Sequence, residues 1–141
     1  MKCTIKKRGL TLLGVILGIG VVGTSAPTAI HYVAQRRAED RLDTIVRNLA
    51  GLDMAANQWS ARVDASLAPT RAQLTGEEGN VAYLQWPTGP VTGTYAVGAP
   101  NRTIAEHEIP ARATFDGGSK GPMNRLEWQR TCGADPAGCG L

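Results

Sequence analysis

The chain has few residues of the kinds that build reactive centres and large cores. Aromatic side chains make up 5% of its 141 residues, and it contains only two histidines and three cysteines. With so few aromatics, we expect a modest hydrophobic core that needs a covalent staple. No Ser-His-Asp or Cys-His arrangement can be argued from the spacing, and no glycine-rich stretch has the lysine of a phosphate loop. We therefore expect no enzyme, no cofactor and no small-molecule substrate.

Positive charge is scarce outside the first nine residues. The net charge is +3, but four basic residues stand at the start of the chain: Lys2, Lys6, Lys7 and Arg8. From Leu10 onward the chain has 11 basic and 12 acidic residues. A nucleic-acid-binding surface needs clustered positive charge, so no nucleic-acid partner is indicated.

The two histidines do not form a metal site. His31 stands beside Tyr32 near the end of an apolar run, where an interfacial pair is the ordinary interpretation. His107 alternates with Glu106 and Glu108, which is typical of a solvated strand edge. We therefore predict no metal ion.

Two cysteines bracket a short C-terminal loop, from Cys132 to Cys139, with Pro136 and two glycines between them. An even pair at the end of an exported domain indicates a disulfide. Two free thiols or half of a metal site are the alternatives, but no histidine lies near the pair and no second cysteine pair exists. Cys3 lies apart, in the basic N-terminal stretch.

The N-terminus combines a basic stretch, residues 1–9, with an uncharged apolar run, residues 10–34. A helix of about 20 apolar residues crosses a bilayer core, so the run is long enough to span a membrane. The basic flank is expected to stay in the cytoplasm, which sends the rest of the chain across. We predict a single membrane pass.

Three interpretations of this N-terminus compete. A secretory signal peptide would be cut near Thr24 and Ala26, although Pro27 follows directly. An uncleaved signal anchor would keep the whole segment. A third kind of leader is cut before the apolar run, after a glycine, and the run is retained.

Residues 35–68 are predicted to continue the helix in amphipathic form, to about Leu67. Their apolar positions recur every three or four residues, the period of a one-sided helix. These positions are Leu42, Ile45, Val46, Leu49, Leu52, Ala56, Trp59, Val63 and Leu67. Nothing between residues 34 and 42 stops a helix, so one continuous helix is the simplest prediction.

Residues 69–141 are predicted to form a small antiparallel sheet of three or four strands. After a loop at 69–80, the β-like runs are Val81–Trp86, Val91–Val97, Ile104–Phe115 and Arg125–Cys132. Turn residues at 87–90, 98–101 and 117–122 separate them. The sheet needs a cover, and the amphipathic helix is the available one. We interpret the tryptophans as core residues that clamp helix to sheet: Trp59, Trp86 and Trp128.

The stretch from Lys6 to Leu13, KKRGLTLL, resembles the start of type IV pilins and type II secretion pseudopilins. The end of the chain, from Leu126 to Cys132, is similar to the last strand of many pilins, where a tryptophan precedes the first cysteine of a disulfide-bounded region. The resemblance covers the architecture of the whole chain, and the N-terminal stretch is its one motif in the strict sense.

The resemblance implies a pilin-like α+β fold and a non-enzymatic, structural role. Prepilin peptidase would cut between Gly9 and Leu10 and methylate the new amine of Leu10. The helix would then hold the subunit in the inner membrane, with the C-terminal domain in the periplasm. From there it would pack against other pilin-like subunits in a filament.

One position departs from the family pattern. The family usually has glutamate at the fifth mature position, and here that residue is Gly14. The glutamate is thought to pair with the terminal amine of the neighbouring subunit and to set its register. Its absence favours a minor or tip subunit over a major one. It also favours the alternative, an envelope or secretion component that is anchored by a single pass in the inner membrane and never enters a filament.

Overall fold

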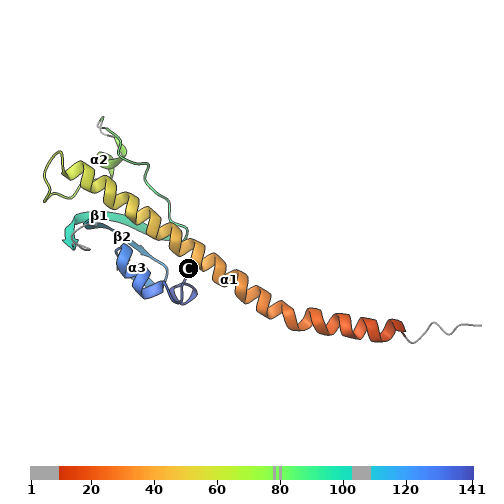
Figure 1. Cartoon of the computed structure of the whole chain (residues 1–141). Helices are drawn as coiled ribbons and strands as arrows, with labels where there is room; N and C mark the ends of the chain where they lie inside the picture. The colour runs from red at the N-terminus through yellow and green to blue at the C-terminus, as the bar shows by residue number, and fades with distance from the viewer. Residues whose placement is uncertain (1–9, 78, 80, 103–108) are drawn as a thin grey trace, which may run out of the picture. The chain divides into compact units, whose positions relative to one another are not determined.

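The computed structural model describes the backbone of residues 10–77, 79, 81–102 and 109–141, and the side chains of residues 29–77, 79, 81–100 and 109–141. The elements in chain order are α1 (Leu10–Ser60), α2 (Arg71–Thr75), β1 (Gly93–Arg102), β2 (Ala111–Gly117), β3 (Lys120–Met123), α3 (Arg125–Cys132) and a 3-10 turn, η1 (Ala137–Cys139) (Figure 1). The predicted α+β class, with a long N-terminal helix and a small antiparallel sheet, is confirmed. The chain divides into two units between Arg36 and Arg37, and each is described by itself.

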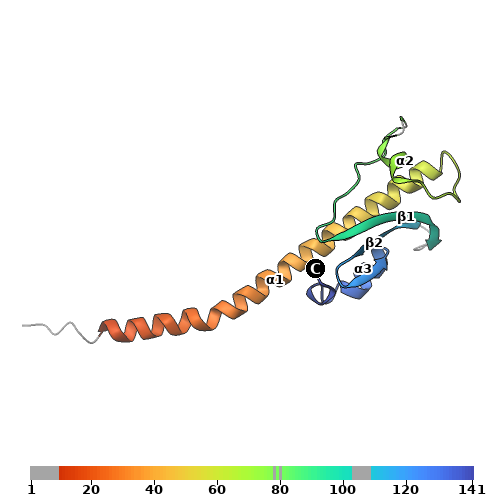
Figure 2. The ribbon, with the colours of Figure 1, turned by 180° about the vertical axis from the view of Figure 1, so that it is seen from behind.

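In the second unit, the later part of α1 covers the sheet. The predicted apolar stripe is buried over most of its length, with Ile45, Leu49 and Leu52 fully enclosed. These side chains pack against Tyr95 of β1 and Phe115 of β2. Both views of the ribbon show this part of α1 running beside β1 and β2 (Figures 1 and 2). The helix therefore supplies the apolar cover that the small sheet needs.

The predicted end of the helix near Leu67 is wrong, because α1 ends at Ser60. Beyond that end, Asp64 holds the chain in a non-helical turn: its Oδ1 accepts hydrogen bonds from the backbone N–H of Ser66 at 2.9 Å and from the Ser66 hydroxyl at 2.7 Å. Such local side-chain bonds compete with helical ones. Two residues of the predicted stripe, Val63 and Leu67, are consequently exposed.

The segment between α1 and the sheet differs from its prediction in two ways. The expected loop at 69–80 contains α2, which starts with a capping box formed by Thr70 and Gln73. The expected strand Val81–Trp86 is not a strand. The backbone N–H groups of Tyr83 and Leu84 donate instead to the Leu74 carbonyl, at 2.9 and 3.3 Å, so part of this segment is tied to α2.

Three antiparallel strands form the described sheet, in the order β1-β2-β3. Residues 98–101, predicted as a turn, instead extend β1 to Arg102. The predicted strand Ile104–Phe115 lies partly outside the described residues; within them, β2 begins at Ala111. The predicted turn at 117–122 is shorter than expected, because Gly117 already pairs with Lys120 of β3. Gly118 makes this tight turn possible, since its φ of 64° is left-handed.

The run Arg125–Cys132, predicted as a strand, is the helix α3. Asn124 and Glu127 form a capping box at its start: each side chain accepts a hydrogen bond of 3.0 Å from the other's backbone N–H. This reciprocal cap satisfies two N–H groups that a helix start leaves open, and it overrides the β-like composition of the run.

Phe115 stands at the centre of the core, between Tyr95 and Trp128. Its ring centroid lies 4.5 Å from that of Tyr95 and 5.8 Å from that of Trp128. The indole N–H of Trp128 donates to the Phe115 carbonyl at 3.2 Å. The Phe115 ring also covers Gly93 and Gly117, which pair directly across the two strands. A Cβ on either glycine would fall 2.5 Å from a ring carbon, so the ring needs both positions to lack a side chain.

We expect Gly117→Ala to lower the free energy of unfolding by about 1–3 kcal/mol, because the added methyl overpacks the Phe115 ring. Gly121→Ala is the matched control: it adds the same methyl in the same hairpin, where nothing lies within 4 Å. Urea unfolding of the full chain, followed by tryptophan fluorescence, measures both. Equal midpoints for the two variants would contradict the close approach.

Candidate functional site

A buried carboxylate joins helix α1 to the middle strand of the sheet. Asp53 is 1% exposed, and its Oδ1 accepts hydrogen bonds from the backbone N–H groups of Arg112 and Ala113, both at 2.7 Å. The register between β1 and β2 breaks beside these residues, between Val97 and Arg102. Asp53 therefore supplies an acceptor where the strand ladder is irregular.

Arg112 carries this connection on to the loop after α1. The side chain is 6% exposed. Its Nε–H donates to Asn57 Oδ1 at 2.6 Å, and its two Nη groups donate to the carbonyls of Leu67, at 3.0 Å, and Ala65, at 2.8 Å. Asn57 also donates to the Pro110 carbonyl at 3.2 Å. One guanidinium thus fixes the path of the loop at 61–69 against β2.

Burial is the largest influence on the pKa of both charged groups. It raises the pKa of Asp53 above its ordinary value, against the smaller opposing effect of the two backbone N–H groups and of Arg125 and Arg112. It lowers the pKa of Arg112, and the Asp53 charge partly offsets this. Among the described residues nothing hydrogen-bonds to Asp53 Oδ2. The arrangement has the character of a structural tie rather than a substrate site, because its groups are enclosed.

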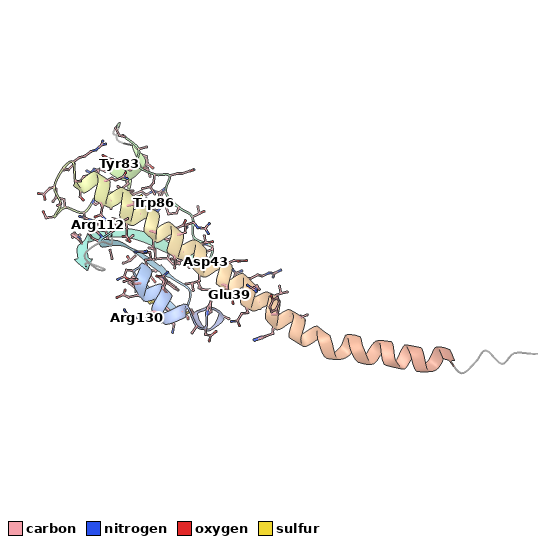
Figure 3. The ribbon with its side chains drawn as sticks, viewed as in Figure 1. Glu39, Asp43, Tyr83, Trp86, Arg112 and Arg130 are labelled. Atoms are coloured by element: carbon pink, nitrogen blue, oxygen red, sulfur yellow. A yellow bond between two sulfur atoms is a disulfide. The ribbon has the colours of Figure 1, made fainter. Side chains whose placement is uncertain are left out.

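Two arginines stack on aromatic rings on the outside of the second unit. The guanidinium of Arg71 lies 5.4 Å from the Trp86 ring centroid, and that of Arg62 lies 5.6 Å from the Tyr83 ring centroid. Tyr83 and Trp86, which are labelled in Figure 3, belong to the segment between α2 and β1. Shallow grooves of about 500, 490 and 450 Å³ lie on this face, and Arg71 and Trp86 line all three. The shared lining by Arg71 and Trp86 makes these grooves one candidate recess for a partner.

The described part of the first unit is helical and leaves large apolar side chains uncovered. Ile30 is 71% exposed, Tyr32 60% and Val33 46%. Arg36 lies over the Tyr32 ring, 5.3 Å from its centroid, and its Nε–H donates to the Tyr32 hydroxyl at 3.0 Å. His31, between the apolar side chains, is also exposed. An aromatic and an arginine next to bare apolar side chains are typical of a boundary between an apolar phase and water.

The residues predicted from the sequence fall in separate places. Cys132 and Cys139 lie together, with sulfurs 2.04 Å apart, as a disulfide between α3 and η1. Leu10 is the first residue of α1 and Gly14 lies in its second turn. Gly9 and His107 lie outside the described residues. Within the described ranges, no group of three or more histidine, cysteine or acidic residues is arranged to hold a metal ion.

The prediction that the tryptophans are core residues is confirmed for Trp59 and Trp128 and only in part for Trp86. Trp59 and Trp128 are buried in the core, at 7% and 0% exposure. Trp86 packs against the core with part of its ring and offers the rest to Arg71. For the part of the chain with described side chains, no helix has an apolar stretch long enough to cross a membrane. The predicted membrane segment, 10–34, lies mostly outside that part and stays a prediction.

Comparison of the chain with family models, with curated proteins and with solved structures gives no match. Its function is therefore argued from its own residues.

Asp53 was not among the residues predicted from the sequence, although a signal for it was present. Asp53 follows Leu49 by four residues and precedes Ala56 by three, so helical geometry places it on the apolar face. A carboxylate on that face needs a buried donor. The pairs of Arg71 with Trp86 and of Arg62 with Tyr83 had no such signal, because their partners come from segments whose packing no local pattern reveals.

We expect Asp53→Ala to lower the free energy of unfolding by about 3 kcal/mol, since two buried N–H groups lose their acceptor. Asp53→Asn keeps an oxygen for them and should cost far less. Urea unfolding at pH 7, followed by tryptophan fluorescence, separates the two variants. Similar losses of unfolding free energy in both variants would show that the Oδ1 acceptor is not the source of the stabilisation by Asp53.

The same pair of proteins, wild type and Asp53→Asn, tests the raised pKa of Asp53. A raised folded-state pKa means that the folded protein holds this proton more tightly than the unfolded chain does. The contribution of Asp53 is therefore fully present below about pH 4 and falls as the pH rises through the folded pKa. Wild type should lose stability relative to Asp53→Asn between pH 4 and 7. A constant difference would contradict the raised pKa.

The disulfide can be tested by counting the free thiols of the protein. Denatured but unreduced protein should show no free thiol at Cys132 or Cys139, and Cys3 should account for any signal. Cys132→Ser with Cys139→Ser is the control and should lower the free energy of unfolding by about 2 kcal/mol, as expected for a short closed loop. Two reactive thiols from the C-terminal loop of the unreduced protein would rule out the bond.

Proposed function

We propose that this chain is a minor pilin or pseudopilin subunit of a type IV pilus or a type II secretion-like filament, with a structural role. The observation that carries the proposal is the change along α1 from exposed apolar side chains to buried ones. From Ala38 to Trp59 the helix contributes to the core of a small sheet domain, while Ile30, Tyr32 and Val33 are exposed. A helix that packs into a core from Ala38 onward and exposes large apolar side chains at residues 30–33 needs a second apolar environment for them.

The sequence supports a particular succession of such environments. Before assembly, the uncharged run at 10–34 would lie in the inner membrane, with the basic residues at 1–9 on the cytoplasmic side. After removal of the leader, the same run would pack against its counterparts in neighbouring subunits. The domain formed by residues 37–141 would then face outward, toward partners.

Tyr32 and Arg36 support a boundary near the end of the apolar run. The Arg36 guanidinium lies over the Tyr32 ring and its Nε–H donates to the Tyr32 hydroxyl, so a positive charge and an amphipathic ring stand together where the apolar run ends. From Arg37 onward the buried residues of α1 belong to the domain core, beginning with Ala38. The proposed apolar segment therefore stops where the domain begins.

Gly14 supports a minor or tip position within such a filament. A subunit with glycine there has no carboxylate to pair with the amine of its neighbour. It therefore lacks the register device of fibre-forming subunits. The same glycine favours the alternative function, a single-pass inner-membrane component of an envelope or secretion complex.

The test is the N-terminus of the mature protein. Intact mass and N-terminal sequencing of the protein from membranes of its own host should show a chain that starts at methylated Leu10. Gly9→Val should leave the chain starting at Met1. Gly14→Ala is the matched control and should be processed like the wild type, since it lies beyond the cut.

Two outcomes would overturn the proposal. A wild-type chain that starts at Met1 would leave the membrane-anchored envelope component. A chain cut after Ala26 would show an ordinary secretory signal peptide and remove the anchor as well.

A further inference from the structure

Strand β1 forms an open edge of the described sheet. It pairs with β2 on one side, and within residues 81–102 and 109–141 no strand pairs with its other side. Alternate residues of an antiparallel edge strand direct both N–H and C=O away from the sheet. The outer edge of β1 therefore presents a row of backbone donors and acceptors that another extended segment can use.

This edge lacks the features that usually prevent strand pairing. Residues 93–99 contain no charge and no proline; the first proline, Pro100, comes near the end of the strand. The exposed side chains along it, at Thr94 and Ala96, are small. Edge strands are ordinarily blocked by lysine, proline or a covering element. The first seven residues of β1 therefore lack the side chains that block a partner strand.

A groove runs along this edge and has a distinct far wall. One part of it, of about 490 Å³, lies between residues 94–97 of β1 and a wall that contains Arg71 and Trp86. A second part, of about 450 Å³, continues past the same two side chains toward residues 87–93. Arg71 is the one charged residue among those lining either part. Its stacking on Trp86 holds the guanidinium at the groove.

We propose that the outer edge of β1 binds an extended segment of another protein, with a carboxylate of that segment opposite Arg71. The backbone edge would supply the affinity through main-chain hydrogen bonds, as in strand addition generally. Arg71 would supply the preference for acidic segments, because no described carboxylate lines these two parts of the groove.

A second copy of this chain fits the edge less well. Pairing of β1 with β1 across a twofold axis would bring two Arg71 side chains toward the same interface, where no described carboxylate lines the groove beside β1. Like charges placed opposite each other destabilise such pairing. The charge of the groove thus favours a different, acidic partner. The inference rests on the geometry of residues 68–71 and 86–97 and does not depend on the processing of the N-terminus.

The test uses synthetic peptides and the full chain in detergent. The probe is a fluorescein-labelled peptide, SVTVEVTS, and its binding is followed by fluorescence anisotropy. Two matched peptides isolate the two parts of the proposal: SVTVQVTS removes the carboxylate, and a version of the probe with alternate N-methylated amides removes strand hydrogen bonding. We expect binding of the probe, about fivefold weaker binding of the glutamine peptide and none of the N-methylated peptide.

Protein variants locate the site. Arg71→Gln should weaken the binding of the glutamate peptide about fivefold, so that the glutamate and glutamine peptides bind this variant equally well. Arg62→Gln is the matched control: it also removes an arginine stacked on an aromatic ring, but it lines neither part of this groove. It should bind like the wild type.

Three results would overturn the proposal: no binding of the probe at millimolar concentration, equal binding of the N-methylated peptide, or an unchanged acidic preference in Arg71→Gln. A concentration-dependent dimer in analytical ultracentrifugation that excludes the probe would assign the edge to a second copy instead. None of these results bears on whether the chain is cut after Gly9, so the two proposals fail independently.

Discussion

The second unit depends on how a single carboxylate is accommodated. Asp53 places one oxygen against two consecutive backbone N–H groups of β2, at a point where the strand ladder is irregular. Apolar packing alone lets a helix slide or rotate over a sheet, because it has little directionality. Two short hydrogen bonds from fixed backbone positions remove that freedom. They set the register of α1 on the sheet, and the aromatic core around Phe115 is built on that register.

Other polar side chains of α1, on both sides of Asp53 in the sequence, also form hydrogen bonds from the helix to the rest of the unit. Asn48 donates to the Tyr95 hydroxyl at 2.9 Å, and Asn57 bonds both Pro110 and Arg112. The helix is therefore fastened at three levels, to β1, to β2 and to the segment before β2. A small core with few aromatics gains its unique arrangement from these directed bonds more than from the area it buries.

The parts of the fold that follow from periodicity were predictable, and those that depend on side-chain caps were not. The helical stripe around Leu49 and the sheet that needs a cover were foreseen, because hydrophobic period is a local property. The C-terminal helix was missed, because the reciprocal cap of Asn124 and Glu127 outweighs the β-forming composition of its residues. The composition of Val81–Trp86 predicts a strand, yet the backbone N–H groups of Tyr83 and Leu84 donate to the Leu74 carbonyl instead of to a neighbouring strand. The groove beside Arg71 and Trp86 was beyond sequence reasoning, since it arises where three separate segments meet.

The grip of Arg112 on the loop after α1 has a consequence for how this protein can change over time. The guanidinium bonds backbone carbonyls, at Ala65 and Leu67, and every amino acid has a carbonyl. The hold of Arg112 on the loop is therefore independent of the side chains at these two positions, and within the loop the bonds between Asp64 and Ser66 add a side-chain contribution. Residues such as Val63 can be replaced without disturbing the frame beneath them. The loop is a part of the surface where new specificities can evolve at little cost in stability, as long as the buried arginine is retained.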